Sequence, residues 1–232
     1  MPFFAHFEID IITALADQLT AAFAGLEPAP LRVENLAIVP SDQGVYHLFR
    51  NRLLVYVGKA DNLRKRLSEH RFKIMGRCNI DVGEMAFACL TVHKNWTALA
   101  PEDSLIKRYR QQSSEVCEWN GISFGPHDPG RDRETTNKDT EGFDAQFPIK
   151  DDWPCDFVDA REWNVRELLI RIKEELPFLL RYEAVNRKYR EGHPDYNNLV
   201  LAVPAAGMPV SELLRLVLRA FQGGSPRNFP AT

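Results

Sequence analysis

The first hydrophobic pattern along the chain has the spacing of a helix. In FEIDIITALADQLTAAFAGL, apolar residues recur every three or four positions, at Ile11, Ile12, Leu15, Leu19, Phe23 and Leu26. This spacing predicts an amphipathic helix of about five turns. The following LEPAP ends it, because proline disfavours the helical conformation in the residue before it. We expect this helix to pack against a core and to carry no chemistry.

The pattern then changes to short β-rich runs. GVYHLF and LLVYVG, on either side of Arg50, Asn51 and Arg52, predict two strands of a hairpin. The separator lacks the Asn-Gly signal of a tight turn, so the pattern leaves the strand register open.

Helix and strand patterns alternate in the next stretch. ADNLRKRLSEHRFK predicts a helix that Asp61 or Asn62 caps and that buries Leu63 and Leu67. EMAFACLTVH predicts a buried strand, and ALAPEDSLIKRYRQQ predicts a helix with Pro101 near its start. The order β-β-α-β-α predicts a small mixed α/β core over residues 42–112.

The pattern is weaker beyond this core. From Glu118 to Trp153 the sequence is polar and rich in glycine and proline, which is typical of a functional or disordered loop. NVRELLIRIKEELPFLLRYEAVNRKYR then predicts helix, with Pro177 either kinking it or opening a second helix. NLVLAVP predicts a strand, and VSELLRLVLRAF predicts an amphipathic helix that begins at Ser211 and Glu212.

Together these elements predict an α/β (α+β) fold with a small mixed β-sheet core flanked by helices. Its parts are an N-terminal helical segment at residues 1–41 that packs on the core, the core with its long loop at 42–153, and a mainly helical extension at 154–232. With 232 residues, 44% of them hydrophobic, the chain can bury this core as one continuous structural unit.

Composition narrows the class of protein. No apolar run approaches the roughly 20 residues of a membrane helix, and the N-terminus lacks the basic-then-apolar order of a secretory signal. We therefore expect a soluble, cytoplasmic protein. The cysteines are too widely spaced for the short CxxC pairs of a zinc site, which favours reduced structural thiols. They are Cys78, Cys89, Cys117 and Cys155.

Charge is distributed unevenly along the chain. The formal net charge of −3 argues against a nucleic-acid partner, because Lys and Arg make most phosphate contacts. Residues 1–42, however, hold one basic residue and six acids, whereas residues 44–77 hold nine basic residues and two acids. This concentration of positive charge predicts a local surface that attracts phosphate, although a solvated basic helix face gives the same pattern.

An ordered set of residues runs through the predicted core. It consists of Gly44-Val45-Tyr46, Tyr56-Val57-Gly58, Arg66, His70, Glu102 and Asn120. The set resembles the GIY-YIG nuclease superfamily, with β-branched valine in place of both isoleucines. A spacing of four residues puts Arg66 and His70 on one helix face. Because side chains alternate along a strand, Tyr46 faces away from Val45 and His47, so a tyrosine on each strand can converge with the helix residues.

The resemblance implies roles in phosphodiester hydrolysis. Glu102 would hold one Mg²⁺ or Mn²⁺ ion jointly with the DNA phosphate, since carboxylate oxygens and water suit these hard ions. Arg66 would contact the scissile phosphate through its planar guanidinium, and Tyr56 would position water or a phosphate oxygen.

Removal of a proton from the attacking water has two candidate routes. Tyr46 is the candidate general base, but an ordinary tyrosine pKa of about 10 leaves it protonated at neutral pH. Lowering that pKa by ~2 units corresponds to about 2.7 kcal/mol of phenolate stabilisation, which we expect from Lys59, Arg66 and the cation. In the alternative route His70 takes or relays the proton, and the sequence does not rank the two.

The long loop narrows the resemblance. Trp119-Asn120-Gly121, FGPHDPGRDR and Phe143-Asp144 are similar to the WN…GFG…DPG…R pattern of the type II restriction endonuclease branch. The resemblance covers residues 44–148. It departs from that branch in a longer gap from Glu102 to Asn120 and in GISFG, which has extra residues where the branch has GFG.

This branch implies sequence-specific cleavage of double-stranded DNA to 5′-phosphate and 3′-hydroxyl ends. It also implies a homodimer on two half-sites and a cognate DNA methyltransferase in the same system. Candidate DNA contacts are Arg64, Lys65, Arg71, Arg131 and Arg133. Two alternatives stay open: a structure- or damage-directed repair nuclease with the same core, and a catalytically idle DNA-binding module.

Overall fold

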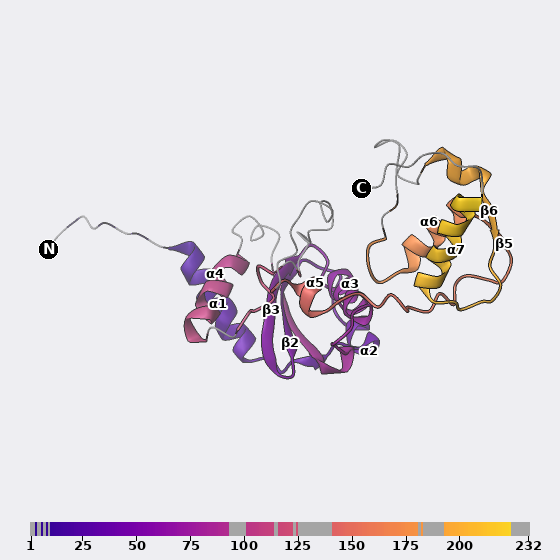
Figure 1. Ribbon diagram of the computed structural model, residues 1–232. Helices are drawn as coiled ribbons and strands as arrows, with labels where there is room; N and C mark the ends of the chain where they lie inside the picture. Colours follow the sequence, from indigo (N-terminus) through magenta and orange to yellow (C-terminus); the bar gives the residue numbers. More distant parts are fainter. Residues whose placement is uncertain are drawn as a thin grey trace. The chain divides into compact units, whose positions relative to one another are not determined.

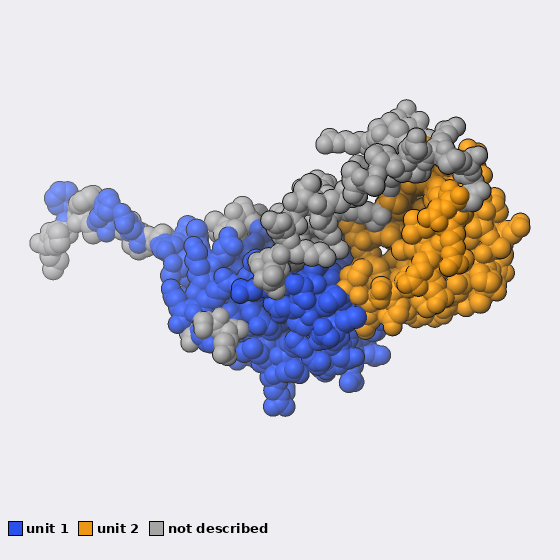
Figure 2. Space-filling view, in the orientation of Figure 1, with its two compact units in different colours: residues 1–148 blue, residues 149–232 orange. Residues whose placement is uncertain are grey.

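The chain forms two compact units, residues 1–148 and residues 149–232 (Figure 2). The computed structural model describes residues 3, 6, 8, 10–92, 101–113, 116–122, 124, 141–180, 182 and 193–223. None of the helices among these residues is both long enough and apolar enough to cross a membrane. The predicted α+β fold class is confirmed, whereas the predicted parts at residues 1–41, 42–153 and 154–232 stay a prediction.

The first unit is built on a four-stranded sheet in the order β1-β4-β2-β3, and neighbouring strands are antiparallel. Its strands are β1 (Ala29–Pro30), β2 (Gly44–Arg50), β3 (Leu53–Ala60) and β4 (Met85–Thr91). GVYHLF and LLVYVG form the predicted hairpin, and EMAFACLTV pairs along the other side of β2. The short β1 was not predicted.

A tight turn and a bulge fix the register that the sequence left open. Arg50 pairs with Leu53, so Asn51 and Arg52 form a two-residue turn, with φ values of 50° and 71°. Two successive left-handed residues are what a turn needs to match the twist of the paired strands. Farther along, Phe49 pairs with Leu54 but Leu48 pairs with Tyr56, which leaves Val55 as an extra residue. The bulge turns Tyr56 to the same face of the sheet as Tyr46.

Helices cover both faces of this sheet (Figure 1). One face packs against α1 (Ile11–Ala24) and α4 (Pro101–Gln112), whose buried residues meet Val45, Val57 and Ala88. The other face packs against three helices and holds the larger aromatic core. These helices are α2 (Val33–Ala37), α3 (Leu63–Met75) and α5 (Phe143–Gln146), and a short 3₁₀ turn, η1 (Val82–Glu84), precedes β4.

Helix α3 has the cap and the buried face that its sequence predicts. The Asn62 side chain accepts a hydrogen bond from the Lys65 backbone N–H at 2.9 Å, which satisfies one of the free donors of the first turn. Leu63, Leu67 and Ile74 are fully buried against the sheet. His70, on the same stripe, is also buried, so the helix carries one polar group into the core.

A short segment after α4 lies along the outer edge of β3. The backbone N–H of Cys117 donates to the Leu54 carbonyl and that of Trp119 to the Val55 carbonyl, both at 2.9 Å. The Asn120 side chain completes this pairing on Val57. The segment Cys117–Asn120, which is a turn, therefore covers part of the outer edge of β3.

The second unit has its own core. A two-stranded antiparallel sheet of β5 (Glu162–Asn164) and β6 (Val200–Ala202) accompanies α6 (Val165–Glu175), the 3₁₀ helix η3 (Pro194–Asn198) and α7 (Val210–Gly223). The predicted strand and last helix are present. Helix α6 ends at Glu175, because Leu176 has an extended backbone (ψ 140°). Residues 176–180 are not helical, so within them Pro177 neither kinks a continuing helix nor opens a second one. The rest of that predicted segment lies mostly outside the described residues.

Candidate active site

Tyr46 and Tyr56 lie on the α3 face of the sheet, with ring centroids 6.1 Å apart. Gly58 pairs directly with Tyr46 across the hairpin. A Cβ atom at Gly58 would lie 2.5 Å from the Tyr46 hydroxyl oxygen and 2.7 Å from Cε1 of Tyr56. The glycine of YVG therefore provides the space in which both tyrosine rings sit.

Helix α3 brings Arg66 and His70 to these tyrosines. The Tyr46 hydroxyl and Nε2 of His70 are 2.7 Å apart, a hydrogen bond inside the core. The Arg66 guanidinium lies close enough to both tyrosines to lower their pKa values, and its Nη1 also pairs with Oε2 of Glu69 at 3.1 Å. The one-face arrangement expected from the four-residue spacing brings both side chains to the tyrosine pair.

Burial shifts both partners of the Tyr46–His70 hydrogen bond toward their neutral forms. Burial, and then the neighbouring Tyr56, raise the pKa of Tyr46 well above its ordinary value, against the opposing effect of Arg66. Burial, followed by Arg66 and Lys73, holds the pKa of His70 well below its ordinary value. The expected lowering of the Tyr46 pKa by Lys59 and Arg66 is thus not achieved by the protein's own groups. Near neutral pH a single proton lies between the two side chains.

Glu102, in the first turn of α4, pairs with Lys59 of β3. The Lys59 Nζ to Glu102 Oε1 distance is 2.9 Å, so the lysine expected to assist Tyr46 instead contacts the carboxylate. The other oxygen, Oε2, is shielded from solvent and has no hydrogen-bond partner among the described residues. A buried carboxylate oxygen without a partner is costly, because it has lost water and gained nothing in return.

This free oxygen fits a divalent cation. Hard ions such as Mg²⁺ take carboxylate oxygens and keep several waters, so one protein ligand is sufficient when substrate oxygens complete the shell. In the parts of the chain that the structure describes, no group of three or more His, Cys, Asp or Glu side chains could hold a metal. The role of Glu102 as the protein ligand stays a prediction.

Asn120 braces the catalytic strand. Its Oδ1 accepts from the Val57 N–H at 2.9 Å and its Nδ2 donates to the Val57 carbonyl at 2.8 Å. Both polar atoms of the Asn120 amide thus bind the backbone of Val57, the residue after Tyr56. This geometry gives Asn120 a positioning contact, and its place among the catalytic residues stays a prediction.

The candidate DNA contacts differ in position. Arg64, Lys65 and Arg71 lie on α3, where Arg64 Nε donates to the Val39 carbonyl at 2.7 Å and Lys65 is exposed. Arg131 and Arg133 fall outside the described residues.

Two residues near the site were not predicted. The Phe124 ring stacks on His70 with centroids 4.7 Å apart, and its carbonyl accepts from Lys73 Nζ at 3.0 Å. Lys73 also lies 5.1 Å above the Phe124 ring. Lys73 follows His70 by three residues, so helical spacing would have placed it on a neighbouring face. Phe124 is the first residue of FGPHDPGRDR, but that pattern does not show its contact with His70, which depends on the tertiary fold.

The sequence around the site matches the model of a known domain family. Residues 43–115 match the model of the GIY-YIG catalytic domain. The chain therefore carries a GIY-YIG catalytic domain, and the predicted GIY-YIG nuclease core is confirmed over these residues. Asn120 and the loop that follows lie beyond the matched range.

Solved structures of one protein are similar to a third of the chain. They are of the N-terminal GIY-YIG endonuclease domain of UvrC from Thermotoga maritima. A point mutant bound to its catalytic divalent cation is 27% identical, over 33% of this chain and 87% of that one, with a TM-score of 0.26. The magnesium-bound form is 27% identical, over 33% and 88%, with a TM-score of 0.25. No curated protein matches the chain.

Proposed function

We propose that the chain is a metal-dependent DNA endonuclease that hydrolyses phosphodiester bonds to 5′-phosphate and 3′-hydroxyl ends. The observation that carries this proposal is the free, buried Oε2 of Glu102, a carboxylate whose charge acts on Tyr56, in the same unit as the hydrogen-bonded Tyr46–His70 pair. The Glu102 carboxylate fits one Mg²⁺ or Mn²⁺ ion per site, and the Tyr46–His70 pair can move a proton. When bound, the ion would supply charge stabilisation at phosphorus and acidify the attacking water.

Tyr46 and His70 act together in the proposed proton transfer. The attacking water gives its proton to the Tyr46 oxygen, while the Tyr46 hydroxyl proton passes along the 2.7 Å hydrogen bond to Nε2 of His70. The water oxygen bonds to phosphorus as the bond to the 3′-oxygen breaks, and that oxygen takes a proton from solvent. Because no free phenolate forms, the raised pKa of Tyr46 is no obstacle. This route requires the His70 tautomer protonated at Nδ1.

The low pKa of His70 also matters after the reaction. A buried imidazolium is unstable, so the proton leaves once the anionic phosphate has departed, and the resting hydrogen bond is restored. During the reaction the phosphate's negative charge favours the imidazolium.

Arg66 and Tyr56 are proposed to hold the phosphate. Arg66 stands next to both tyrosines, and its Nη1 pairs with the partly exposed Glu69, so the approaching phosphate can replace that carboxylate. Tyr56, on the adjacent strand, would orient water or a phosphate oxygen. Lys59 would keep the Glu102 carboxylate oriented.

Sequence-specific cleavage of the type II restriction kind is the finer proposal. Its support is the WNG and DPG-containing pattern after the catalytic domain. One site cuts one strand at a time, so a homodimer would cut both strands of a symmetric target, and a cognate methyltransferase would protect host DNA. Arg64, Lys65, Arg71, Arg131 and Arg133 are the proposed DNA contacts.

Plasmid cleavage in Mg²⁺ tests the proposal. Glu102→Gln should lower cleavage at least about 100-fold, because it weakens the one protein ligand. Glu212→Gln is a matched control, since Glu212 also lies in the first turn of a helix but in the second unit. Discrete fragments would support restriction, and nicking limited to structured or damaged DNA would support a repair nuclease. DNA binding without cleavage by the wild-type protein would refute an enzymatic role.

A further inference from the structure

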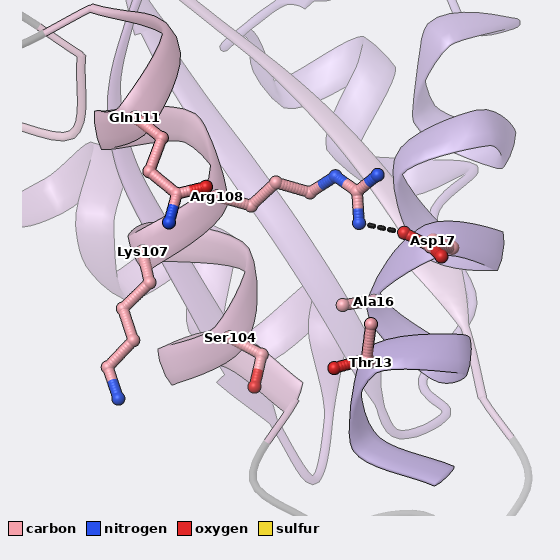
Figure 3. Close-up of a pocket in the computed structure, with 7 residues that line it drawn as sticks. All are labelled: Thr13, Ala16, Asp17, Ser104, Lys107, Arg108 and Gln111. Atoms are coloured by element: carbon pink, nitrogen blue, oxygen red, sulfur yellow. Dashed lines mark hydrogen bonds and ion pairs between the residues drawn. The ribbon is translucent and has the colours of Figure 1, made fainter. Parts of the chain in front are cut away.

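Two hollows in the first unit differ in how their arginines are paired. The larger, of about 620 Å³, lies between α1 and α4. There Arg108 of α4 reaches across to Asp17 of α1 and forms an ion pair (Figure 3). Its positive charge is already matched by the protein itself, so this hollow holds no free arginine for an anion.

The smaller hollow, of about 250 Å³, lies between α2 and α3 and has two unlike walls. Residues Val33, Leu36 and Ala37 of α2 form an apolar wall, and Arg64, Ser68 and Arg71 of α3 form a basic one. Positions 64, 68 and 71 are separated by four and three residues, so they share one flank of the helix.

Neither arginine of this hollow has an acidic partner among the described residues. Arg64 uses Nε on the Val39 carbonyl, and Arg71 uses Nη1 on the Met75 sulfur at 3.1 Å, a weak acceptor. The Nε of Arg71 is shielded from solvent and has no hydrogen-bond partner among the residues that the structure describes. By contrast, Arg66 on the opposite flank pairs with Glu69. The hollow thus holds two guanidinium groups, each anchored at one nitrogen, and one of them has a buried Nε donor that lacks an acceptor among the described residues.

We propose that this hollow binds one backbone phosphate of duplex DNA, with the attached deoxyribose against Val33 and Ala37. The proposal rests on the nuclease function proposed above. Guanidinium groups donate paired hydrogen bonds to phosphate oxygens, and each arginine here is already anchored at one end, which reduces the entropy lost on binding. The apolar wall suits the carbon face of a sugar.

The two flanks of α3 explain why the partner is a duplex. Arg66 faces the tyrosines on one flank, while Arg64 and Arg71 face α2 on the other. A helix with its side chains is about 10–12 Å across, which is close to the width of the major groove of DNA, about 12 Å. Phosphates held on the two flanks would therefore belong to opposite strands across a groove. This match between the width of the helix and the width of the groove favours a duplex over a single strand.

Equilibrium binding without cleavage tests this site. We would measure the affinity of the Glu102→Gln protein for labelled duplex and for the matching single strand by fluorescence anisotropy at several salt concentrations. Adding Arg64→Gln and Arg71→Gln should weaken duplex binding about tenfold and reduce the salt slope by about 1, the value for one lost phosphate contact. Single-strand binding should change less. Arg52→Gln is the matched control, an exposed arginine on the β2–β3 turn.

A second variant separates a built site from general attraction to positive charge. Ala37→Phe fills the hollow without changing the net charge, and we expect it also to weaken duplex binding. Ile38→Phe, next to it but 83% exposed and outside the hollow, should not. Circular dichroism would verify that each variant is folded.

The outcomes distinguish the two proposals. Unchanged duplex binding in either the double arginine variant or Ala37→Phe would overturn the phosphate site, and an equal loss for single strands would overturn the duplex assignment. Wild-type cleavage of plasmid would leave the nuclease function standing in those cases. A wild-type protein that neither cuts nor binds DNA would instead refute the nuclease function itself.

Discussion

His47 makes the stability of the first unit sensitive to acid. It lies on β2 facing α1, is 3% exposed, and stacks on Phe23 with ring centroids 3.6 Å apart. Its Nε2 has no hydrogen-bond partner among the described residues. Burial lowers the pKa of His47 to about 3. An imidazolium at this position would have neither water nor an acceptor at Nε2.

The sign and size of the effect follow from proton linkage. The unfolded chain binds a proton at His47 below its ordinary pKa of about 6.5, whereas the folded protein does so only near pH 3. The contribution to stability is therefore fully present above about pH 6.5 and is lost as the pH falls toward 3. At pH 5 the loss is about 2 kcal/mol, a large part of a typical 5–15 kcal/mol. His70 shifts in the same direction.

Replacement of His47 by phenylalanine keeps an aromatic ring and removes the titration. We would measure the free energy of unfolding in urea at pH 7 and pH 5 for both proteins. The wild type should lose about 2 kcal/mol more than His47→Phe between these pH values. The second unit is identical in both proteins, so its pH dependence cancels in the difference. Equal losses in the two proteins would refute the assignment of a buried, neutral His47.

Two further substitutions test how the catalytic strand is held. Gly58→Ala places a methyl group against both tyrosines and should lower cleavage about 100-fold. Gly25→Ala, whose Cβ would have ordinary contacts, is the control. Equal cleavage by the two variants would contradict this account. Asn120→Asp replaces the donor to the Val57 carbonyl by an acceptor. It should lower the free energy of unfolding by about 1–3 kcal/mol, and unchanged urea unfolding would show that Asn120 is no brace.

The sequence predicted the elements whose pattern is long enough to show a period. Helices α1 and α3, the β2–β3 hairpin and β4 all have local spacing that favours one structure. Elements of two to five residues, such as β1, α2 and α5, are too short to show a period, and they form because neighbouring elements supply their partners. The sequence left two alternatives at Pro177, a kink or a second helix, because proline limits the conformation of the residue before it but does not fix where the next element begins. In the structure α6 ends at Glu175.

The same distinction applies to the site. The four-residue spacing of Arg66 and His70 was sufficient to place them on one side of a helix. The Val55 bulge, which turns Tyr56 toward Tyr46, has no sequence pattern of its own. The Tyr46 pKa was expected in the wrong direction because burial, the largest cause of its shift, is a property of the folded core. Likewise, the pairing of Lys59 with Glu102 joins distant parts of the chain.

The segment Cys117–Asn120 has a consequence for association between molecules. The last strand of a sheet normally presents free N–H and C=O groups to any extended chain, and this is a common route to aggregation. Here those groups at Leu54, Val55 and Val57 are already taken. The residues that hold the Tyr56 strand in place therefore also occupy the edge groups through which that strand could pair with another molecule. Protection of this edge and the position of Tyr56 depend on the same few hydrogen bonds.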